Sequence, residues 1–199
     1  MQLQDIHFGW PGRPPLFSGL SVTVPPGVTW LGGDESTGKT TLLRLMGGEL
    51  APLRGAVHAN SPVYWVNPRD DGADALTPPQ CFDRVAAQHP ALDRALLADL
   101  VQALDLSPHL AKQLHMLSTG SQRKVWLAAG LASGAAVALL DQPFAAVDKA
   151  SMRVVTELLR DAASHLARAF VVADYEPPDG VPLAATISLF CPPALNGPA

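Results

Sequence analysis

Cysteine is scarce in this chain of 199 residues, and its scarcity excludes several kinds of site. The two cysteines, Cys81 and Cys191, lie far apart and form neither a CxxC pair nor a ligand cluster. A disulfide framework or a cysteine-based metal site is therefore not expected, and buried or surface thiols are the better interpretation. The six histidines also lack the spacing of metal ligands, so we expect them to be structural or solvated.

The sequence also lacks a concentration of positive charge and a long apolar run. The formal net charge is -4 and the lysines and arginines are scattered, which disfavours nucleic acid as a direct partner. Glycine, proline or charged residues interrupt every apolar stretch before the roughly 20 residues of a membrane helix. The N-terminus has no basic-then-apolar signal pattern. These features favour a soluble, cytoplasmic chain.

The length and apolar content limit what the chain can build. With 199 residues and 48% apolar content, one α/β core is feasible, with a small subdomain inserted in it. Two full domains are not expected.

A glycine-rich segment, Gly33 to Thr40, has the pattern G-x-x-x-x-G-K-T between an apolar run, Val28 to Leu31, and a helix-like run, Thr41 to Met46. In such a strand, turn and helix, the backbone N–H groups point into one concavity and the helix dipole adds to the attraction for phosphate. The pattern predicts a nucleoside triphosphate site; the alternative is a chance glycine turn. The predicted phosphate-binding residues are Gly33, Asp34, Glu35, Ser36, Thr37, Gly38, Lys39, Thr40 and Thr41.

Three of these residues have specific predicted roles. The Lys39 side chain is expected to reach the β- and γ-phosphates, and the Thr40 hydroxyl is expected to ligate Mg²⁺. Thr41 is expected to lie close to the α-phosphate. The cofactors predicted by the pattern are ATP and Mg²⁺.

Two short alternating runs precede the glycine-rich segment, around Ile6 and around Val22, and predict a pair of strands. The turn-rich loop between them carries Trp10, which we interpret as a platform for a nucleotide base. Stacking of a base on an aromatic ring is worth about 1–3 kcal/mol. The alternative is that Trp10 is a hydrophobic clasp on the loop, because tryptophan buries a large apolar area wherever it lies.

From Pro78 to Leu117 the composition shifts to Ala, Leu and Asp at helical spacing, with an apolar stripe that runs from Leu92 to Leu104. We expect a small helical subdomain over residues 78–117, inserted into a single domain over residues 1–199. Residues 1–77 and 118–199 would then form the β-rich core. Further strands are expected around Val57 and over residues 63–66.

After the helical region, Leu117 to Lys124 opens another predicted helix, whose serine- and glycine-rich start is a second potential anion site. Serine is also a good N-cap, so this alternative stays open. The apolar run of residues 137–140 predicts a strand that ends at Asp141, a carboxylate suited to holding Mg²⁺ beside the phosphates. The alternative is an aspartate that merely ends a strand. A helix from Lys149 to about Arg168 and a strand over residues 169–173 follow.

The order of these motifs resembles that of the ATP-binding subunit of ABC transporters, and the resemblance covers nearly the whole chain. Residues 33–40 match the Walker A pattern, residues 117–121 are similar to the signature LSGGQ, and residues 139–143 look like Walker B. Asp148 falls at the aspartate of the D-loop, and Trp10 at the aromatic residue that stacks on adenine. The resemblance implies an α/β fold: a P-loop NTPase core of mostly parallel sheet, with an N-terminal antiparallel β lead-in and an inserted α-helical subdomain.

The resemblance also implies the assembly. In the family, two cassettes close head to tail on two ATP molecules, so Ser118 and Gly120 would touch a γ-phosphate bound by a second copy of the chain. The partners implied are that second copy and a separate membrane permease, with the subunit peripheral on the inner face of the cell membrane.

The chain departs from the family pattern at the position that follows the Walker B aspartate. The family has a glutamate there that polarises the attacking water, and this chain has Gln142. Loss of such a group typically costs about 10²–10⁴ in rate, so ATP hydrolysis is expected to be slow or trapped. Two interpretations stay open: Gln142 is the natural residue of a slow or nucleotide-switched subunit, or it replaces a glutamate to trap the ATP-bound dimer.

Other positions of the family pattern also differ. Asp174 stands where the family carries the switch histidine that contacts the γ-phosphate, and an anion there would repel the phosphate. The glutamine expected after the strand at residues 63–66 is absent, and only Asn67 there has a side chain able to ligate water or metal. The fifth residue of the signature is Ser121, with Gln122 displaced by one position.

These observations support one leading function and two alternatives. The leading function is an energy-coupling subunit that binds MgATP, dimerises and drives a permease. The first alternative is a nucleotide-dependent regulatory module with vestigial hydrolysis, motivated by Gln142 and Asp174. A small-molecule kinase is the weakest alternative, because it needs an acceptor pocket and extra cations over the phosphates.

Overall fold

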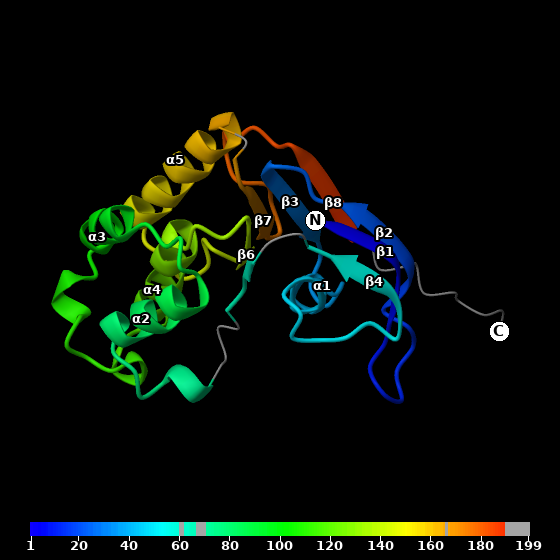
Figure 1. Cartoon of the computed structure of the whole chain (residues 1–199), viewed down its shortest axis with the longest axis horizontal. Helices are drawn as coiled ribbons and strands as arrows, with labels where there is room; N and C mark the ends of the chain where they lie inside the picture. Colours follow the sequence, from blue (N-terminus) through cyan, green and yellow to red (C-terminus); the bar gives the residue numbers. More distant parts are fainter. Residues whose placement is uncertain (60–61, 67–70, 166, 190–199) are drawn as a thin grey trace, which may run out of the picture.

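The computed structural model describes residues 1–59, 62–66, 71–165 and 167–189 (Figure 1). A five-stranded sheet, parallel throughout, forms its centre. In spatial order its strands are β5 (Val63–Tyr64), β6 (Val137–Asp141), β7 (Ala169–Ala173), β3 (Gly27–Gly33) and β8 (Ala185–Leu189). This arrangement confirms the predicted, mostly parallel α/β core.

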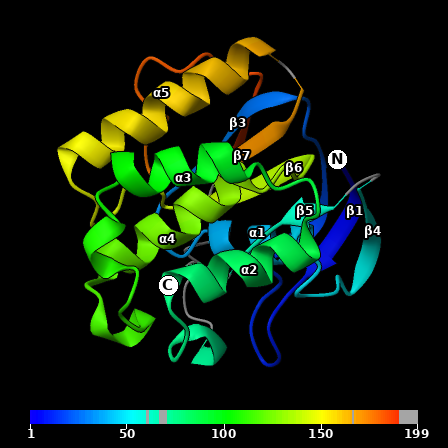
Figure 2. The same cartoon turned by 60° about the vertical axis from the view of Figure 1, so that its left-hand side comes forward.

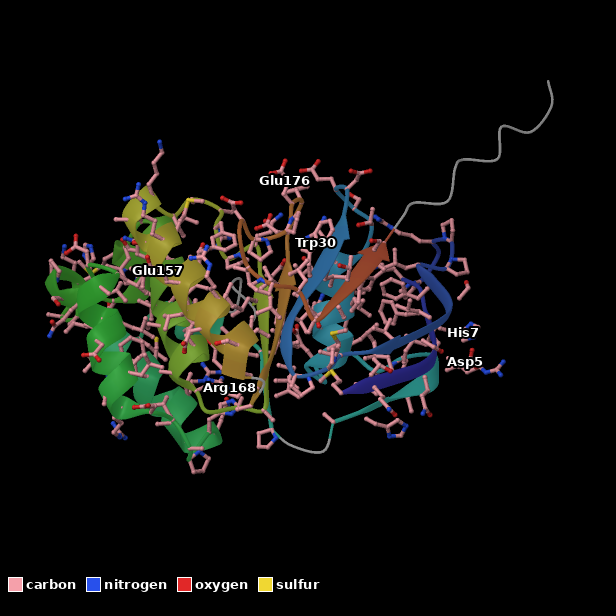
Figure 3. The ribbon with its side chains drawn as sticks, turned by 90° about the horizontal axis from the view of Figure 1, so that it is seen from above. Asp5, His7, Trp30, Glu157, Arg168 and Glu176 are labelled. Atoms are coloured by element: carbon pink, nitrogen blue, oxygen red, sulfur yellow. The ribbon has the colours of Figure 1, made fainter. Side chains whose placement is uncertain are left out.

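A second sheet, antiparallel, lies at one end of the molecule. It consists of β2 (Phe17–Thr23), β1 (Gln2–Phe8) and β4 (Arg54–His58) in that order. The sheet confirms the predicted antiparallel lead-in and adds β4 to it. Irregular pairing marks the middle of β1, where Asp5 adopts a left-handed φ of 49° and its carboxylate contacts His7 at 3.0 Å. Figure 3 shows Asp5 and His7 together at the outer edge of this sheet.

Five α-helices are found in the described part of the chain. They are α1 (Lys39–Met46), α2 (Pro78–Gln88), α3 (Arg94–Ala103), α4 (Thr119–Ala132) and α5 (Lys149–His165). Three short 3₁₀ turns lie at Asp71–Ala73, Ser107–His109 and Leu114–Met116. None of the helices in the described ranges combines the length and apolar character needed to cross a membrane.

Side chains cap the starts of both α-helices of the residue 78–117 region. Thr77 and Gln80 form a reciprocal capping box at the start of α2, and the Asp93 carboxylate accepts two N–H groups at the start of α3. Figure 2 shows α2 and α3 gathered with α4 and α5 on the same side of the molecule. Their apolar side chains share one core with the parallel sheet. The division of residues 1–199 into a β-rich core and a separate helical subdomain stays a prediction.

The interior strand β3 contributes to two hydrophobic cores. Val28 packs into the core with α2 to α5, and Leu31 packs into the core with α1 and the antiparallel sheet. Both side chains are completely buried. A strand buried on both faces has a nearly continuous apolar sequence, which is why the short apolar runs predicted β3, β6 and β7 well.

Two predicted elements are shorter than expected. β5 ends at Tyr64 instead of residue 66, because Trp65 turns away, packs on Gly47 and donates from Nε1 to Glu49 at 2.8 Å. α5 ends at His165, before Arg168. The Arg168 guanidinium instead donates to two carbonyl oxygens, that of Leu131 in the last turn of α4 at 2.8 Å and that of Ala135 just after the helix at 2.6 Å. Both changes depend on contacts between distant parts of the chain.

Of the two cysteines, only Cys81 lies within the described residues. Cys81 is completely buried, and burial raises the pKa of its thiol to about 11. Cys191 lies outside the described residues.

Candidate nucleotide-binding site

The conformation of the loop between β3 and α1 depends on its glycines. Gly38, the N-cap of α1, has a left-handed φ of 99°, and a Cβ there would lie 2.9 Å from a methyl group of Leu16. Ser36 also has a positive φ, 61°, although it is not a glycine. No side chain caps the start of α1. The backbone therefore curls tightly and presents the N-terminus of α1 without a competing cap.

Lys39 is folded back over this loop. Its side chain is buried, with 7% exposed, and Nζ donates to the carbonyl oxygens of Gly33 at 2.5 Å and Asp34 at 2.8 Å. The loop adds a bond of its own, from the Thr37 hydroxyl to the Asp34 carbonyl at 2.9 Å. The ammonium is thus fixed at the start of the loop, where it can bind an anion.

The loop and the end of β6 are joined by a bond between two predicted metal ligands. The Thr40 hydroxyl donates to Asp141 Oδ2 at 2.7 Å. The pKa of Asp141 is raised above its usual value by burial. The bond from Thr40 and the positive charges of Arg123 and Lys39 partly oppose this shift. Hydroxyl and carboxylate oxygens suit Mg²⁺. The third predicted ligand, Asn67, lies outside the described residues.

Gln142 continues from β6 into a tight turn. It has a left-handed φ of 46°, and its backbone N–H donates to the Ala173 carbonyl of β7 at 2.8 Å. The Gln142 carbonyl accepts the Ala145 N–H at 3.1 Å. A left-handed residue other than glycine costs about 1–2 kcal/mol, and such strain clusters at functional sites. The turn places Gln142 next to Asp141 at the carboxyl edge of the sheet.

Asp174 follows β7 at the same edge. Its N–H donates to the Leu31 carbonyl at 3.2 Å, and its own carbonyl accepts the Trp30 indole N–H at 3.3 Å. The Asp174 carboxylate accepts the Tyr175 N–H at 2.8 Å. Burial raises the pKa of Asp174, and the backbone bond from Tyr175 opposes this effect. The backbone of Asp174 is therefore held firmly against β3.

Tyr175, which the sequence reasoning missed, lies over the loop. Its ring faces the Lys39 ammonium at 4.5 Å from the ring centroid, and its hydroxyl donates to Glu35 Oε1 at 3.3 Å. The side chain remains 48% exposed. An aromatic residue two positions after a strand that ends at the site edge was the only signal in the sequence.

Trp10 lies in the loop between β1 and β2. It packs edge-on against Phe8, with ring centroids 5.3 Å apart, and the Arg44 guanidinium of α1 lies 5.7 Å from its ring. The side chain is 38% exposed, so part of the ring is accessible. These contacts fit a hydrophobic clasp, and the exposed part of the side chain is compatible with a platform for a base, so both interpretations of Trp10 stand.

The start of α4 is organised differently from that of α1. The Ser118 hydroxyl accepts the Ser121 N–H at 3.1 Å and so caps the helix. Gly120 packs against the Ala146 carbonyl so closely that a Cβ would overlap it. The Gln122 amide donates to the carbonyl of Leu114 at 2.8 Å. Within the described part of the chain, Ser118 and Gly120 contact their own helix start and residue 146.

Two basic side chains of α4 bind the loop that follows Gln142. The Lys124 ammonium lies 2.5 Å from Asp148 Oδ2, and the Arg123 guanidinium donates to the Ala145 carbonyl. Asp148 also accepts the Ser151 N–H at 2.9 Å at the start of α5. The bond from Lys124, followed by that from Ser151, lowers the pKa of Asp148. Residues 142–148 are thus held by α4 on one side and α5 on the other.

Residues 17–145 match the family described as ABC transporter, which is more than half of the chain. The chain belongs to the ABC transporter family. This finding confirms the resemblance to the ATP-binding subunit that the order of motifs had indicated.

Relatives of established name support the same assignment. The intermembrane phospholipid transport system ATP-binding protein MlaF of Escherichia coli strain K12 is 30% identical over 206 residues, which cover 92% of this chain and 76% of that protein. The taurine import ATP-binding protein TauB of Pseudomonas fluorescens strain Pf0-1 is 28% identical over 96% of this chain and 78% of its own length. This chain is thus similar to the ATP-binding components of transport systems.

Solved structures confirm the fold. An ABC transporter ATP-binding protein from Pyrococcus furiosus superimposes with a TM-score of 0.73 at 21% identity, over 94% of this chain and 96% of that one. The dimeric, post-hydrolysis structure of an ATP-binding cassette bound to ADP and Pi gives a TM-score of 0.72 at 16% identity, over 88% of each chain. The chain has the P-loop NTPase fold of ABC ATPase domains.

Proposed function

We propose that this ABC ATPase subunit binds MgATP at the loop of residues 33–40, dimerises head to tail and couples nucleotide binding to a separate membrane permease. The observation that carries the proposal is the convergence of Lys39, Thr40 and Asp141 at the carboxyl edge of the parallel sheet. Ligands of open α/β sheets bind at this edge. The helices between Pro78 and Leu117 would supply the docking surface for the permease, and the subunit would be peripheral on the inner face of the cell membrane.

The residues present fit a bound magnesium ion. Thr40 and Asp141 supply oxygen donors 2.7 Å apart, next to the loop that would hold the phosphates. Both would hold Mg²⁺, with Asn67 as a further predicted ligand. The ion would neutralise charge on the phosphate oxygens. The chain's own Lys39 would add a fixed positive charge at the same end.

The second copy would complete the site. Ser118 and Gly120 lie at the start of α4, and the N-terminus of this helix would face a γ-phosphate bound by the partner. The similarity to a dimeric ATP-binding cassette supports this arrangement. Trp10 would stack on the adenine ring.

Slow hydrolysis is the second part of the proposal. Gln142 follows Asp141 in the position where a general base would be needed, and an amide does not accept the proton of the attacking water. Asp174 adds a carboxylate nearby that would repel the terminal phosphate. ATP would therefore bind and hold the dimer closed without rapid turnover.

Size-exclusion chromatography with light scattering tests the dimer. Addition of MgATP should shift the purified chain from the mass of a monomer to that of a dimer, and the Lys39→Ala variant should remain monomeric. An Arg153→Ala variant on the outer part of α5 serves as the control and should dimerise like the parent. A parent chain that stays monomeric at saturating MgATP, or that associates with no permease, would overturn this function.

A second candidate is a regulatory module in which ATP only switches conformation. Gln142 and Asp174 favour it, because both alter positions that turnover needs. The ATPase rate of Gln142→Glu separates the two functions: a rise of about a hundredfold or more supports a motor that lacks one group. A rate unchanged by this substitution supports the switch.

A further inference from the structure

Tyr175 connects two residues of the phosphate loop. Its ring lies 4.5 Å from the Lys39 ammonium, and its hydroxyl donates to the Glu35 carboxylate at 3.3 Å. A lysine ammonium has three N–H donors. Two of them are directed to the carbonyls of Gly33 and Asp34, and the aromatic ring lies over the same ammonium. The ring and a phosphate oxygen would therefore use the same side of Lys39.

The fold determines where Tyr175 lies. The residue before it, Asp174, is bonded through its N–H to Leu31 and through its carbonyl to the Trp30 indole. The Trp30 ring lies across Gly32, where any Cβ would overlap it. Figure 3 shows Trp30 and Glu176 on the same side of the molecule. The backbone on which Tyr175 stands is therefore fixed to β3, while the Tyr175 side chain is half-exposed and makes its contacts with Lys39 and Glu35.

Charge at this end of the loop adds to the effect of the ring. Glu35 is exposed on the loop beside Lys39. The Asp174 carboxylate interacts electrostatically with the positive charges of Lys39 and Arg123. In phosphate loops the backbone N–H groups hold the α- and β-phosphates, whereas the lysine reaches the β- and γ-phosphates. A terminal phosphate would meet both the ring over Lys39 and the Glu35 carboxylate. A diphosphate has no terminal γ-phosphate to meet the ring and the carboxylate, and the backbone N–H groups together with Lys39 would hold its two phosphates.

We propose that Tyr175, with Glu35, is a specificity-determining residue that weakens binding of nucleoside triphosphates relative to diphosphates. Tyr175 must leave Lys39 before a terminal phosphate can bind there, so the affinity for ATP is reduced by the fraction of molecules in which the contact is closed. This inference rests on the proposed function, since it requires that nucleotide binds at the loop. It assigns to Tyr175 a role that is separate from the family position occupied by Asp174.

Titration calorimetry with MgATP and MgADP tests the proposal on the parent chain and three variants. The measured quantity is the ratio of the Kd for ATP to the Kd for ADP. Tyr175→Ala removes the cation–π contact and the bond to Glu35, and should lower this ratio about tenfold. Tyr175→Phe keeps the ring over Lys39 and should lower it only about twofold to threefold. Leu183→Ala, an exposed apolar change in the same segment between β7 and β8, should leave it unchanged.

The outcomes separate the two proposals. If the parent binds neither nucleotide, the proposed function fails and this inference fails with it. If both nucleotides bind but Tyr175→Ala leaves the ratio within twofold of the parent, only the role of Tyr175 is overturned. A ratio that rises in Tyr175→Ala would show that the phenol assists the terminal phosphate, which also contradicts the proposal.

Discussion

Two helices of this chain begin at glycine-containing turns, and they use their first residues in opposite ways. At α1, the N-cap is Gly38, which offers no side chain to the helix N–H groups. At α4, the N-cap is Ser118, whose hydroxyl accepts an N–H of the first turn, and Gly120 is packed against Ala146. The start of α1 is therefore accessible to a ligand, whereas the start of α4 is capped and packed against its own chain.

A shared glycine-containing composition therefore does not imply an equally accessible helix start. A helix N-terminus attracts anions only where its N–H groups are accessible. Around α1 the surrounding side chains also converge, because Lys39 and Thr40 lie beside Asp141. Around α4 the nearby cations Arg123 and Lys124 are directed to residues 145 and 148. Within one copy, α4 therefore stabilises the loop after β6, and only a second copy would bring a phosphate to it.

Among substitutions at these two helix starts, Gly120→Ala is expected to change the free energy of unfolding most. At a solvent-exposed helix position, replacing glycine by alanine would stabilise the fold by about 0.5–1 kcal/mol. Here the added Cβ would overlap the Ala146 carbonyl, a backbone atom, so we expect destabilisation by about 1–3 kcal/mol. Urea denaturation measures the change. Thr119→Ala, an exposed change in the same turn, is the control, and equal stability of the two variants would show that α4 is not fastened at residue 146.

A smaller effect is expected from Ser118→Ala. Loss of the cap leaves the Ser121 N–H without its side-chain acceptor and should lower the free energy of unfolding by about 1 kcal/mol. Ser118→Asp restores an acceptor and should recover most of the loss. Thermal unfolding of both variants checks the prediction. It would be wrong if alanine and aspartate gave the same midpoint.

The smallest effect is expected from the ion pair of Lys124 and Asp148. This pair lowers the pKa of Asp148, so the folded chain binds fewer protons there than the unfolded chain, whose aspartates titrate near about 3.9. The stabilisation is therefore present above about pH 4 and is lost as the pH falls below that value. Because Asp148 is half-exposed, the effect should be about 0.5 kcal/mol or less.

Lys124→Met tests this pair by urea denaturation between pH 5 and pH 3. The difference in stability between the parent and the variant should be present at pH 5 and should shrink toward pH 3. A difference that stays constant over this range would show that Lys124 acts through packing alone.

The sequence predicted the elements that are encoded by a continuous local pattern of residues. The apolar runs predicted β6 and β7, with Asp141 correctly at the end of β6, because strands buried on both faces are apolar at nearly every position. The glycine pattern predicted the turn before α1 because only a left-handed φ at Gly38 permits it. The assignment to the ABC transporter family followed from the order of the motifs.

The contacts that the sequence did not predict join distant residues. Tyr175 lies 136 positions after Lys39 yet covers its ammonium, and no periodicity along the chain encodes that contact. The same holds for the indole of Trp30, which binds the carbonyl of Asp174, and for Arg168 at the end of α4. Such contacts arise from the order of the parallel strands, which places β7 between β6 and β3.

The assignment of the nucleotide to the start of α1 is tested most directly by the affinity for MgATP of the parent chain and of Lys39→Ala, measured by titration calorimetry on folded protein. One ATP per chain is expected for the parent. The affinity of Lys39→Ala should be about 10–100-fold weaker, because a charge-assisted hydrogen bond is worth about 1.5–3 kcal/mol. Binding by Lys39→Ala that equals that of the parent would contradict the assignment of the nucleotide to the start of α1.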